Sequence, residues 1–339
     1  MELSESIWKE YTKLNFLGYS ENSKAYKAKS KKGNKTVVIK EYSKRQKNSE
    51  ALYYNEIKYM KELESENTIK CIKNEETKDY YYIIREFHYG TLDEFIKIHP
   101  NGLSIKEIQK ILLDLSIPFK LLNKKNLIHK DIKPSNILFS YDEKNNAKSI
   151  LSGVYLTQKL GEKNYIEIKP LKYICPPEIL KGKEYDMKSD IWSLGILIYF
   201  LIKGNYPFNE KRDMVILREI DKGIDLNISN DNDLNDLLKN TLEKDVEKRF
   251  SWNEFFNHQF LKKKFIDKNV IFTEILKIKK EINNVKKKSI LTIRDYGILI
   301  STYGNDEILG KIYEDNISKP IKQAYMDLVQ ILYSKKFNG

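Results

Sequence analysis

The chain has 339 residues, 41% of them hydrophobic, and a formal net charge of +12 at pH 7. This composition favours an ordinary soluble globular protein, long enough for a two-lobed domain and an additional module. A positive charge suits anionic partners in general. Because no Arg-rich or aromatic-interleaved basic patch stands out, we expect no nucleic acid partner.

Cysteine content and hydropathy exclude three further classes. Two cysteines, Cys71 and Cys175, are too few for a disulfide framework and have no CxxC context for zinc. The N-terminal segment MELSESIWKEY is polar and acidic, which argues against a signal peptide. The longest apolar run, at 194–202, is too short to span a bilayer. We therefore expect no transmembrane segment and a cytoplasmic location, with the nucleus as the alternative.

The first part of the chain, from Trp8 to about Glu86, has a strand-like pattern. Alternating apolar residues predict strands at 13–19, 24–29, 36–42 and 79–87. A single helical period interrupts them at 51–63. The sequence thus predicts a small β-rich lobe.

Helical periods dominate from Leu92 onward. They predict helices at 92–98, 104–126 and 190–204, with Ser104 as an N-cap and Gly204 as a C-terminal stop. The joint between the strand-rich and helical parts falls at 86–90, and a cleft between two lobes is where a ligand is expected.

A basic stretch after Phe260 leads into three amphipathic segments, at about 270–285, 288–302 and 318–335. We therefore expect an α+β, bilobal fold with a helical extension. The predicted organisation is a lead-in at 1–9, a domain at 10–262 and a helical module at 263–339. Within the domain the small lobe is 10–86, the hinge 87–90 and the large lobe 91–262.

The segment HKDIKPSNILF, at 129–139, carries side chains suited to phosphoryl transfer. Such transfer needs a carboxylate near the attacking hydroxyl, cations along the phosphates and oxygen ligands for metal ions. Asp131 is the candidate carboxylate, Lys133 the candidate cation beside the moving phosphoryl group, and Asn136 a candidate metal ligand.

This segment closely resembles the catalytic loop of the eukaryotic protein kinases, and the resemblance covers about residues 10–262. The large-lobe sequence is most similar to Ser/Thr kinases of the calcium/calmodulin-dependent and Unc-51-like kinds. The resemblance implies a bilobal kinase fold, ATP as the nucleotide with magnesium or manganese, and a protein substrate or protein partner.

The resemblance also implies nucleotide-binding residues. TVVIK makes Lys40 the cation for the α- and β-phosphates, and NEIKYMKEL makes Glu56 its partner. Arg85 takes the gatekeeper position behind the adenine pocket. Further residues implied to line the ATP site are Gly18, Ala25, Val38, Glu86, His88 and Leu138.

Four residues are implied to hold the fold rather than to react. His129 is a scaffold residue of the catalytic loop, and Asp190 holds the backbone of that loop. Glu178, in CPPEIL, is expected to pair with Arg249.

The sequence departs from the kinase pattern where Asp-Phe-Gly is expected, since Leu151, Ser152 and Gly153 stand there. Leucine supplies no hard oxygen ligand for magnesium, so Asn136 is the one metal ligand left. Ser152 replaces the phenylalanine that would stack beneath Met60.

Other motifs are also changed. Of the three glycines of the nucleotide-covering loop only Gly18 remains, with Ser20 and Ser23 in place of the others. Lys130 replaces an arginine, and Leu171 stands where Ser/Thr kinases have a threonine.

Arg85 raises a further hypothesis. A buried guanidinium needs a carboxylate or water, and Glu56 is one conceivable partner, which would leave Lys40 free.

Three functional hypotheses follow. The first is a pseudokinase that binds ATP weakly or without metal and acts as a scaffold or allosteric partner. The second is an active Ser/Thr kinase with a degenerate metal site, in which Asn136 and water hold magnesium or manganese. The third assigns the work to the basic C-terminal module, which would bind a partner protein or an acidic membrane. The joint loss of the metal-binding aspartate, two glycines and the threonine favours the first.

Overall fold

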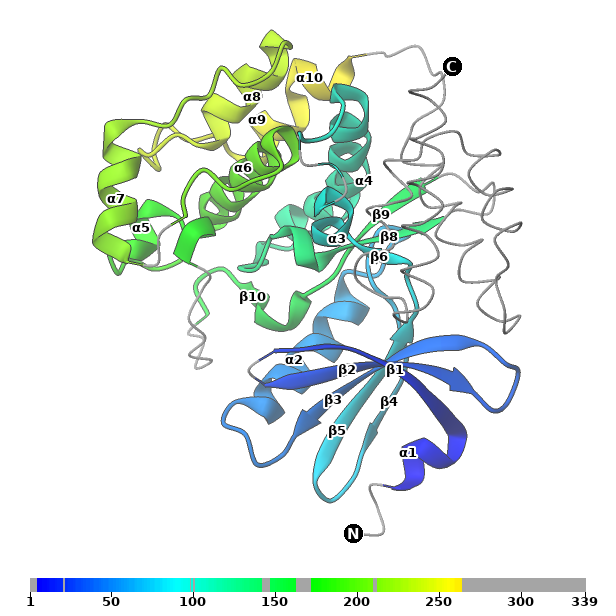
Figure 1. Cartoon of the computed structure of the whole chain (residues 1–339). Helices are drawn as coiled ribbons and strands as arrows, with labels where there is room; N and C mark the ends of the chain where they lie inside the picture. The colour runs from blue at the N-terminus through cyan, green and yellow to red at the C-terminus, as the bar shows by residue number, and fades with distance from the viewer. Residues whose placement is uncertain are drawn as a thin grey trace, which may run out of the picture.

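The computed structural model describes residues 5–20, 22–97, 99, 101–141, 147–162, 172–209 and 212–263. The three helical segments predicted after residue 263 lie outside these residues, and so does Leu171. The described chain forms a β-rich lobe and a helical lobe, as predicted (Figure 1).

The small lobe is built on a five-stranded antiparallel sheet in the order β1-β2-β3-β5-β4. Its strands are β1 (Tyr11–Tyr19), β2 (Ser23–Ser30), β3 (Thr36–Ser43), β4 (Cys71–Glu76) and β5 (Tyr80–Glu86). The register sets Ala25 opposite Lys40 and Val38 opposite Arg85. Candidate residues from three strands are thereby fixed in one region of the sheet.

Two elements of this lobe differ from the prediction. The residues before Tyr11, for which no helix was predicted, form α1 (Glu5–Glu10), and Ile7 and Tyr11 are buried four positions apart. Strand β4 was not predicted. It lies at the sheet edge with alternate residues exposed, and its sequence CIKNEE carries polar groups that mask the strand pattern.

Helix α2 (Ser49–Glu62) packs against the sheet, and its predicted range of 51–63 is confirmed within two residues. Its buried residues recur at helical spacing and include Leu52, Tyr53, Ile57 and Met60. Glu56 lies on the same face and is completely buried. A buried carboxylate needs a partner, which the sheet supplies.

The large lobe contains most of the helices (Figure 1). They are α3 (Leu92–Lys97), α4 (Ile105–Lys124), α5 (Pro177–Leu180), α6 (Met187–Lys203), α7 (Asp213–Lys222), α8 (Asn232–Thr241), α9 (Trp252–Asn257) and α10 (Gln259–Lys262). Short strands β6 (Gly90–Thr91), β7 (Leu127–Ile128), β8 (Ile137–Tyr141), β9 (Ala147–Leu151) and β10 (Gln158–Lys159) lie near the small lobe. Three 3-10 turns complete the lobe: η1 (Pro134–Asn136), η2 (Val154–Leu156) and η3 (Lys172–Ile174).

The predicted helix ends are confirmed in two cases. The hydroxyl of Ser104 accepts a hydrogen bond from the Glu107 N–H at 3.3 Å, and the Glu107 carboxylate accepts one from the Ser104 N–H at 2.8 Å. This reciprocal cap starts α4. Gly204 ends α6 with φ of 73°, a conformation that favours glycine.

The chain crosses between the lobes after β5 ends at Glu86, and β6 begins the large lobe at Gly90. Strand β9 also connects the lobes, because the Leu151 N–H donates to the Asn67 carbonyl at 2.8 Å and the Leu151 carbonyl accepts from the Ile69 N–H at 2.9 Å. Among the helices described, none combines the length and apolarity needed to cross a bilayer.

Candidate active site

Lys40 and Glu56 form the predicted ion pair. The Lys40 Nζ lies 2.8 Å from Glu56 Oε2, and the Tyr42 hydroxyl donates to the same oxygen. Burial lowers the pKa of Lys40, against the opposing charge of Glu56. Burial acts to raise the pKa of Glu56, but the positive charges of Lys40 and Arg85 together lower it below its ordinary value. The two side chains therefore form a buried ion pair.

The hypothesis that Arg85 takes Glu56 and leaves Lys40 free is wrong. Glu56 pairs with Lys40, and the Nε of Arg85 is buried without a hydrogen-bond partner in the described part of the chain. The charge of Arg85 adds to the positive potential around Lys40. Arg85 thus adds a second positive charge near Glu56, beside that of Lys40.

The residues implied to line the adenine pocket come from five places. Ala25 lies on β2, Val38 on β3 and Leu138 on β8, while Glu86 ends β5. His88 lies in the crossing segment, and neither of its ring nitrogens has a partner within the described residues. Burial lowers the pKa of His88 to about 4, with a further contribution from Arg85, so this ring is neutral at pH 7.

The loop that would cover the nucleotide is held by hydroxyl groups. Gly18 lies opposite Ala25 with φ of 151°, and no atom lies within 4 Å of a side chain placed there. Beyond it the Ser20 and Ser23 hydroxyls lie 2.8 Å apart, and the Ser23 N–H donates to the Ser20 hydroxyl at 3.1 Å. The two serines thus close the turn where the kinase pattern has glycines.

The Asp131 carboxylate is bonded on both oxygens. Lys133 Nζ lies 2.8 Å from Oδ1, and the Asn136 side-chain amide donates to Oδ2 at 2.7 Å. The same amide donates to the Asp131 carbonyl at 2.7 Å. The Tyr155 hydroxyl also donates to Oδ2, at 2.6 Å. The three predicted catalytic residues are therefore together, with a fourth residue that the sequence did not indicate.

Asp190 holds the backbone of the catalytic loop in the way expected. Its carboxylate accepts from the His129 N–H at 2.6 Å and from the Lys130 N–H at 2.9 Å. Lys130 has φ of 68°, a conformation unusual for a residue with a side chain. Burial raises the pKa of Asp190 to about 7, although the two N–H groups oppose the rise.

His129 connects the catalytic loop to the segment after β9. Its Nδ1 accepts from the Asp131 N–H at 3.2 Å, so its Nε2 carries the proton and donates to the Ser152 carbonyl at 3.1 Å. Burial lowers the pKa of His129 to about 4, against the charge of Asp131. The ring is neutral and acts as a positioning residue.

Glu178 and Arg249 form the second predicted ion pair. Two parallel bonds join them, Nη1 to Oε1 at 2.8 Å and Nη2 to Oε2 at 2.9 Å. The guanidinium is completely buried, donates also to the Lys188 carbonyl at 3.0 Å, and lies over the Trp192 ring. This bidentate pair joins α5 to the segment before α9.

The Leu151-Ser152-Gly153 segment brings no carboxylate to the catalytic loop. Leu151 is fully buried in the hydrophobic core. The Ser152 hydroxyl donates to the Asn136 carbonyl at 2.9 Å. Gly153 has φ of 78°, and a Cβ there would lie 2.4 Å from the Asn136 side chain, so only glycine fits. In the described ranges there is no group of three or more His, Cys, Asp or Glu residues arranged to hold a metal ion.

Sequence reasoning missed three residues of this site: Tyr42, Asn55 and Tyr155. Asn55 is next to Glu56 on α2, and its side-chain amide donates to the carbonyls of Tyr155 and Thr157, both at 2.8 Å. Only the position of Tyr155, two residues beyond Gly153, offered a sequence signal.

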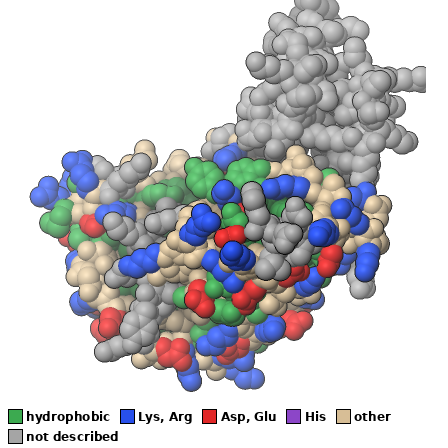
Figure 2. Space-filling model, turned by 90° about the horizontal axis from the view of Figure 1, so that it is seen from below, with side chains coloured by type: hydrophobic (Ala, Val, Ile, Leu, Met, Phe, Trp, Pro, Cys, Tyr) green, Lys and Arg blue, Asp and Glu red, His purple; other side chains and the backbone are tan. Residues whose placement is uncertain are grey.

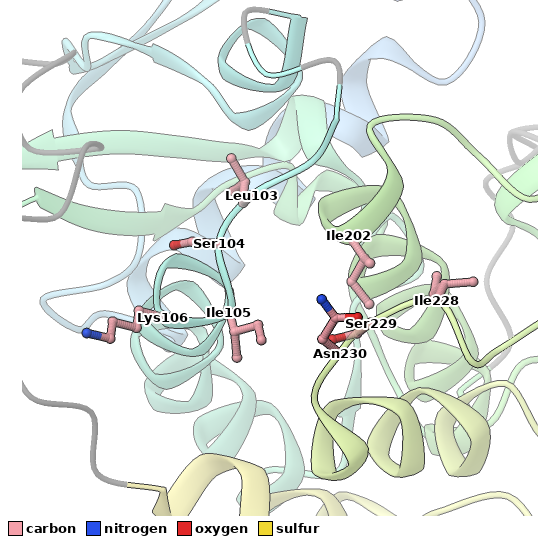
Figure 3. A pocket seen from close by; sticks show the side chains of 8 residues that line it. All are labelled: Leu103, Ser104, Ile105, Lys106, Ile202, Ile228, Ser229 and Asn230. Carbon is pink, nitrogen blue, oxygen red and sulfur yellow. The ribbon is translucent and has the colours of Figure 1, made fainter.

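A separate surface pocket of about 500 Å³ lies between the start of α4, the end of α6 and the segment before α8 (Figure 3). Its lining is mainly aliphatic, and none of the candidate site residues belongs to it. The lining residues are Leu103, Ser104, Ile105, Lys106, Ile202, Ile228, Ser229 and Asn230.

Charges of both signs are mixed on the outer face of the small lobe. Figure 2 shows Lys and Arg side chains interspersed with Asp and Glu over this face, with hydrophobic groups between them. On this face the positive charges therefore do not form a continuous patch.

Comparison with known proteins agrees with this geometry. A family model for the protein kinase domain matches residues 11–261. The chain therefore belongs to the protein kinase family, which implies ATP as the nucleotide.

Among curated proteins, the chain is similar to three Ser/Thr kinases or calcium-dependent kinases. It is 30% identical to "Calcium-dependent protein kinase 5" of Plasmodium berghei, over 78% of this chain and 50% of that protein. It is 31% identical to "Serine/threonine-protein kinase atg1" of Dictyostelium discoideum, over 72% and 38%. For "Serine/threonine-protein kinase unc-51" of Caenorhabditis elegans the identity is 27%, over 74% and 31%. The chain spans half or less of the length of these relatives.

Proposed function

We propose that this chain is a pseudokinase that binds ATP weakly or without metal and acts as a scaffold or allosteric signalling partner in the cytoplasm. The observation that carries the proposal is the state of Asp131, whose carboxylate oxygens are bonded by three side chains while Leu151 occupies the position of the metal-binding aspartate.

The donor set does not fit a magnesium ion. Mg²⁺ requires near-octahedral oxygen ligands, and Leu151 supplies none. The Asn136 amide nitrogen is directed at Asp131, which leaves its carbonyl oxygen as the remaining ligand. In-line phosphoryl transfer relies on metal ions to neutralise developing charge. Losing about 4 kcal/mol of transition-state stabilisation lowers the rate roughly a thousandfold.

The nucleotide itself fits better than the metal. Lys40 is paired with Glu56, whose Oε2 also accepts from the Tyr42 hydroxyl, and 11% of the Lys40 side chain remains exposed toward a phosphate oxygen. Aliphatic groups of Ala25, Val38 and Leu138 suit an adenine ring. We infer that binding energy comes from these contacts rather than from a metal bridge.

An active kinase is the alternative function, and one observation favours it. The Lys40–Glu56 ion pair is formed, and Asp131 lies in contact with both Lys133 and Asn136. With Asn136 and water holding magnesium or manganese, such an enzyme would transfer phosphate slowly.

A thermal-shift titration with ATP, alone and with magnesium or manganese, tests the proposal, since a ligand that binds only the folded state raises the melting temperature. We expect a rise that needs no metal, and its loss in Lys40→Met. We also expect no phosphate transfer to a protein substrate above the level of Asp131→Asn. A metal-dependent rise together with transfer abolished by Asp131→Asn would establish the active kinase instead.

A further inference from the structure

We propose that Tyr155 is a plug of the nucleotide cleft: its side chain bridges Lys40 and Asp131 and must leave before a triphosphate can engage both residues. The inference deepens the proposed function and rests on it, because it concerns nucleotide binding in this same cleft.

Two contacts define the plug. The Tyr155 hydroxyl donates to Asp131 Oδ2 at 2.6 Å, a bond strengthened by the charge of the acceptor. At the same time Lys40 Nζ lies 4.6 Å from the centre of the Tyr155 ring, within the range of a cation–π interaction. One side chain thus contacts both of the charged groups that a phosphate chain and a substrate hydroxyl would contact.

The hydroxyl stays a donor at neutral pH. Burial raises the pKa of Tyr155, and the negative charge of Asp131 raises it further. A phenolate beside that carboxylate is therefore excluded, and the bond persists over the physiological range.

The side chain of Asn55, on α2, holds Tyr155 in this position. The Asn55 side-chain amide donates to the carbonyls of Tyr155 and Thr157, at 2.8 Å each, which fixes turn η2 against the helix. Glu56, the partner of Lys40, is the next residue on that helix. Because the helix holds both the turn and the lysine, a displacement of α2 acts on the plug and on the ion pair together.

The plug lowers apparent affinity for nucleotide in proportion to the fraction of molecules in which it is withdrawn. Removing the hydroxyl weakens the plugged state and leaves the ring, whereas removing the side chain abolishes the plugged state. Both changes leave Lys40, Glu56 and the aliphatic residues implied to line the adenine pocket unsubstituted, and only the removal of the whole side chain also removes the ring contact to Lys40.

The test is a fluorescence titration of the full chain with an N-methylanthraniloyl ATP analogue in buffer containing EDTA. We expect Tyr155→Phe to lower Kd about tenfold, since one charge-assisted hydrogen bond is lost, and Tyr155→Ala to lower it further. Asn55→Ala, which removes the hydrogen bonds to the Tyr155 and Thr157 carbonyls, should also lower Kd. Tyr53→Phe is the matched control, because it removes another buried tyrosine hydroxyl, one that accepts from Asn74 at 3.1 Å outside the cleft. Its Kd should equal that of the unaltered protein.

An unchanged or higher Kd in Tyr155→Phe overturns the plug, and so does the absence of binding in every variant. If Tyr155→Ala does not fold, Tyr155→Phe and Asn55→Ala decide the question. The proposed function fails by a different measurement, phosphate transfer by the unaltered protein. A tighter Kd in the variants together with such transfer would retain the plug and reject the pseudokinase.

Discussion

The interior of the large lobe and the candidate active site both contain residues of the kinase pattern, but they differ in how closely those residues keep the partners that the pattern implies. In the large lobe, Glu178, Arg249 and Asp190 each have the partner that the kinase pattern implies. In the candidate active site, Lys40 keeps Glu56 and Asp131 keeps Asn136, but Tyr155 contacts both Lys40 and Asp131, and Leu151 stands in place of an acid. The parts that hold a kinase fold are therefore separable from the parts that hold metal and phosphate.

Burial explains why the two regions differ in the substitutions that they tolerate. Removing one partner of a buried ion pair leaves an unpaired charge at a cost of several kcal/mol, so Glu178 and Arg249 constrain each other. Leu151, in contrast, is buried among apolar side chains and leaves no polar group unsatisfied. Loss of the metal-binding acid therefore carries no penalty in folding.

Breaking the ion pair between Glu178 and Arg249 should have the largest effect on stability. We expect Arg249→Met to lower the free energy of unfolding by about 3–5 kcal/mol, because it leaves Glu178 buried without its bidentate partner. Urea denaturation measures this. The neighbouring Lys248→Met is the matched control: Lys248 is 76% exposed and paired with Asp245, so its loss should cost under about 1 kcal/mol. Equal effects would show that burial does not distinguish the two pairs.

Acidification should lower the stability of the protein through His129. Its pKa is about 4 in the folded chain and 6.5 ordinarily, so between these values the unfolded chain binds a proton that the folded chain does not. The stability that neutral His129 provides is complete above pH 6.5 and is lost as the pH falls toward 4. Between pH 6.5 and 5 this amounts to about 2 kcal/mol.

The comparison of His129→Phe with the unaltered protein isolates this group. Asp190, whose pKa is raised to about 7, and His88 titrate in both proteins and cancel in the difference. Urea denaturation at pH 6.5 and at pH 5 gives the free energy of unfolding at each pH. We expect the difference between the two free energies to be smaller in the variant, by the same amount of about 2 kcal/mol. Identical pH dependence in both proteins would contradict a buried neutral His129.

Arg85 should have the smallest effect. Its Nε has no partner among the described residues, and its charge lies beside Lys40 and His88. We expect Arg85→Met to tighten ATP binding about fivefold, or about 1 kcal/mol, with no loss of stability, because an adenine ring then covers an apolar side chain rather than a guanidinium whose Nε has no partner. Arg85→Lys, which keeps the charge, should leave Kd near that of the unaltered protein. An unchanged Kd in Arg85→Met would show that Arg85 does not obstruct the cleft.

Much of the fold follows from local sequence signals. Helix α2, the cap at Ser104 and the stop at Gly204 depend on residues within a few positions of each other, and each was predicted. Helix α1 and edge strand β4 were not, since the first is short and the second alternates exposed polar groups. Whether their residues pack depends on the rest of the sheet.

The sequence by itself determined that this chain has the catalytic loop of a kinase and a leucine in place of a metal ligand, because both are properties of contiguous residues. Only the tertiary structure decided what occupies the space between the charged groups. Tyr155 reaches Asp131 across 24 positions, and Asn55 reaches the Tyr155 carbonyl across 100. Hydrogen bonds over such separations depend on the packing of α2 against η2 and on the dry environment this creates, neither of which a linear pattern encodes.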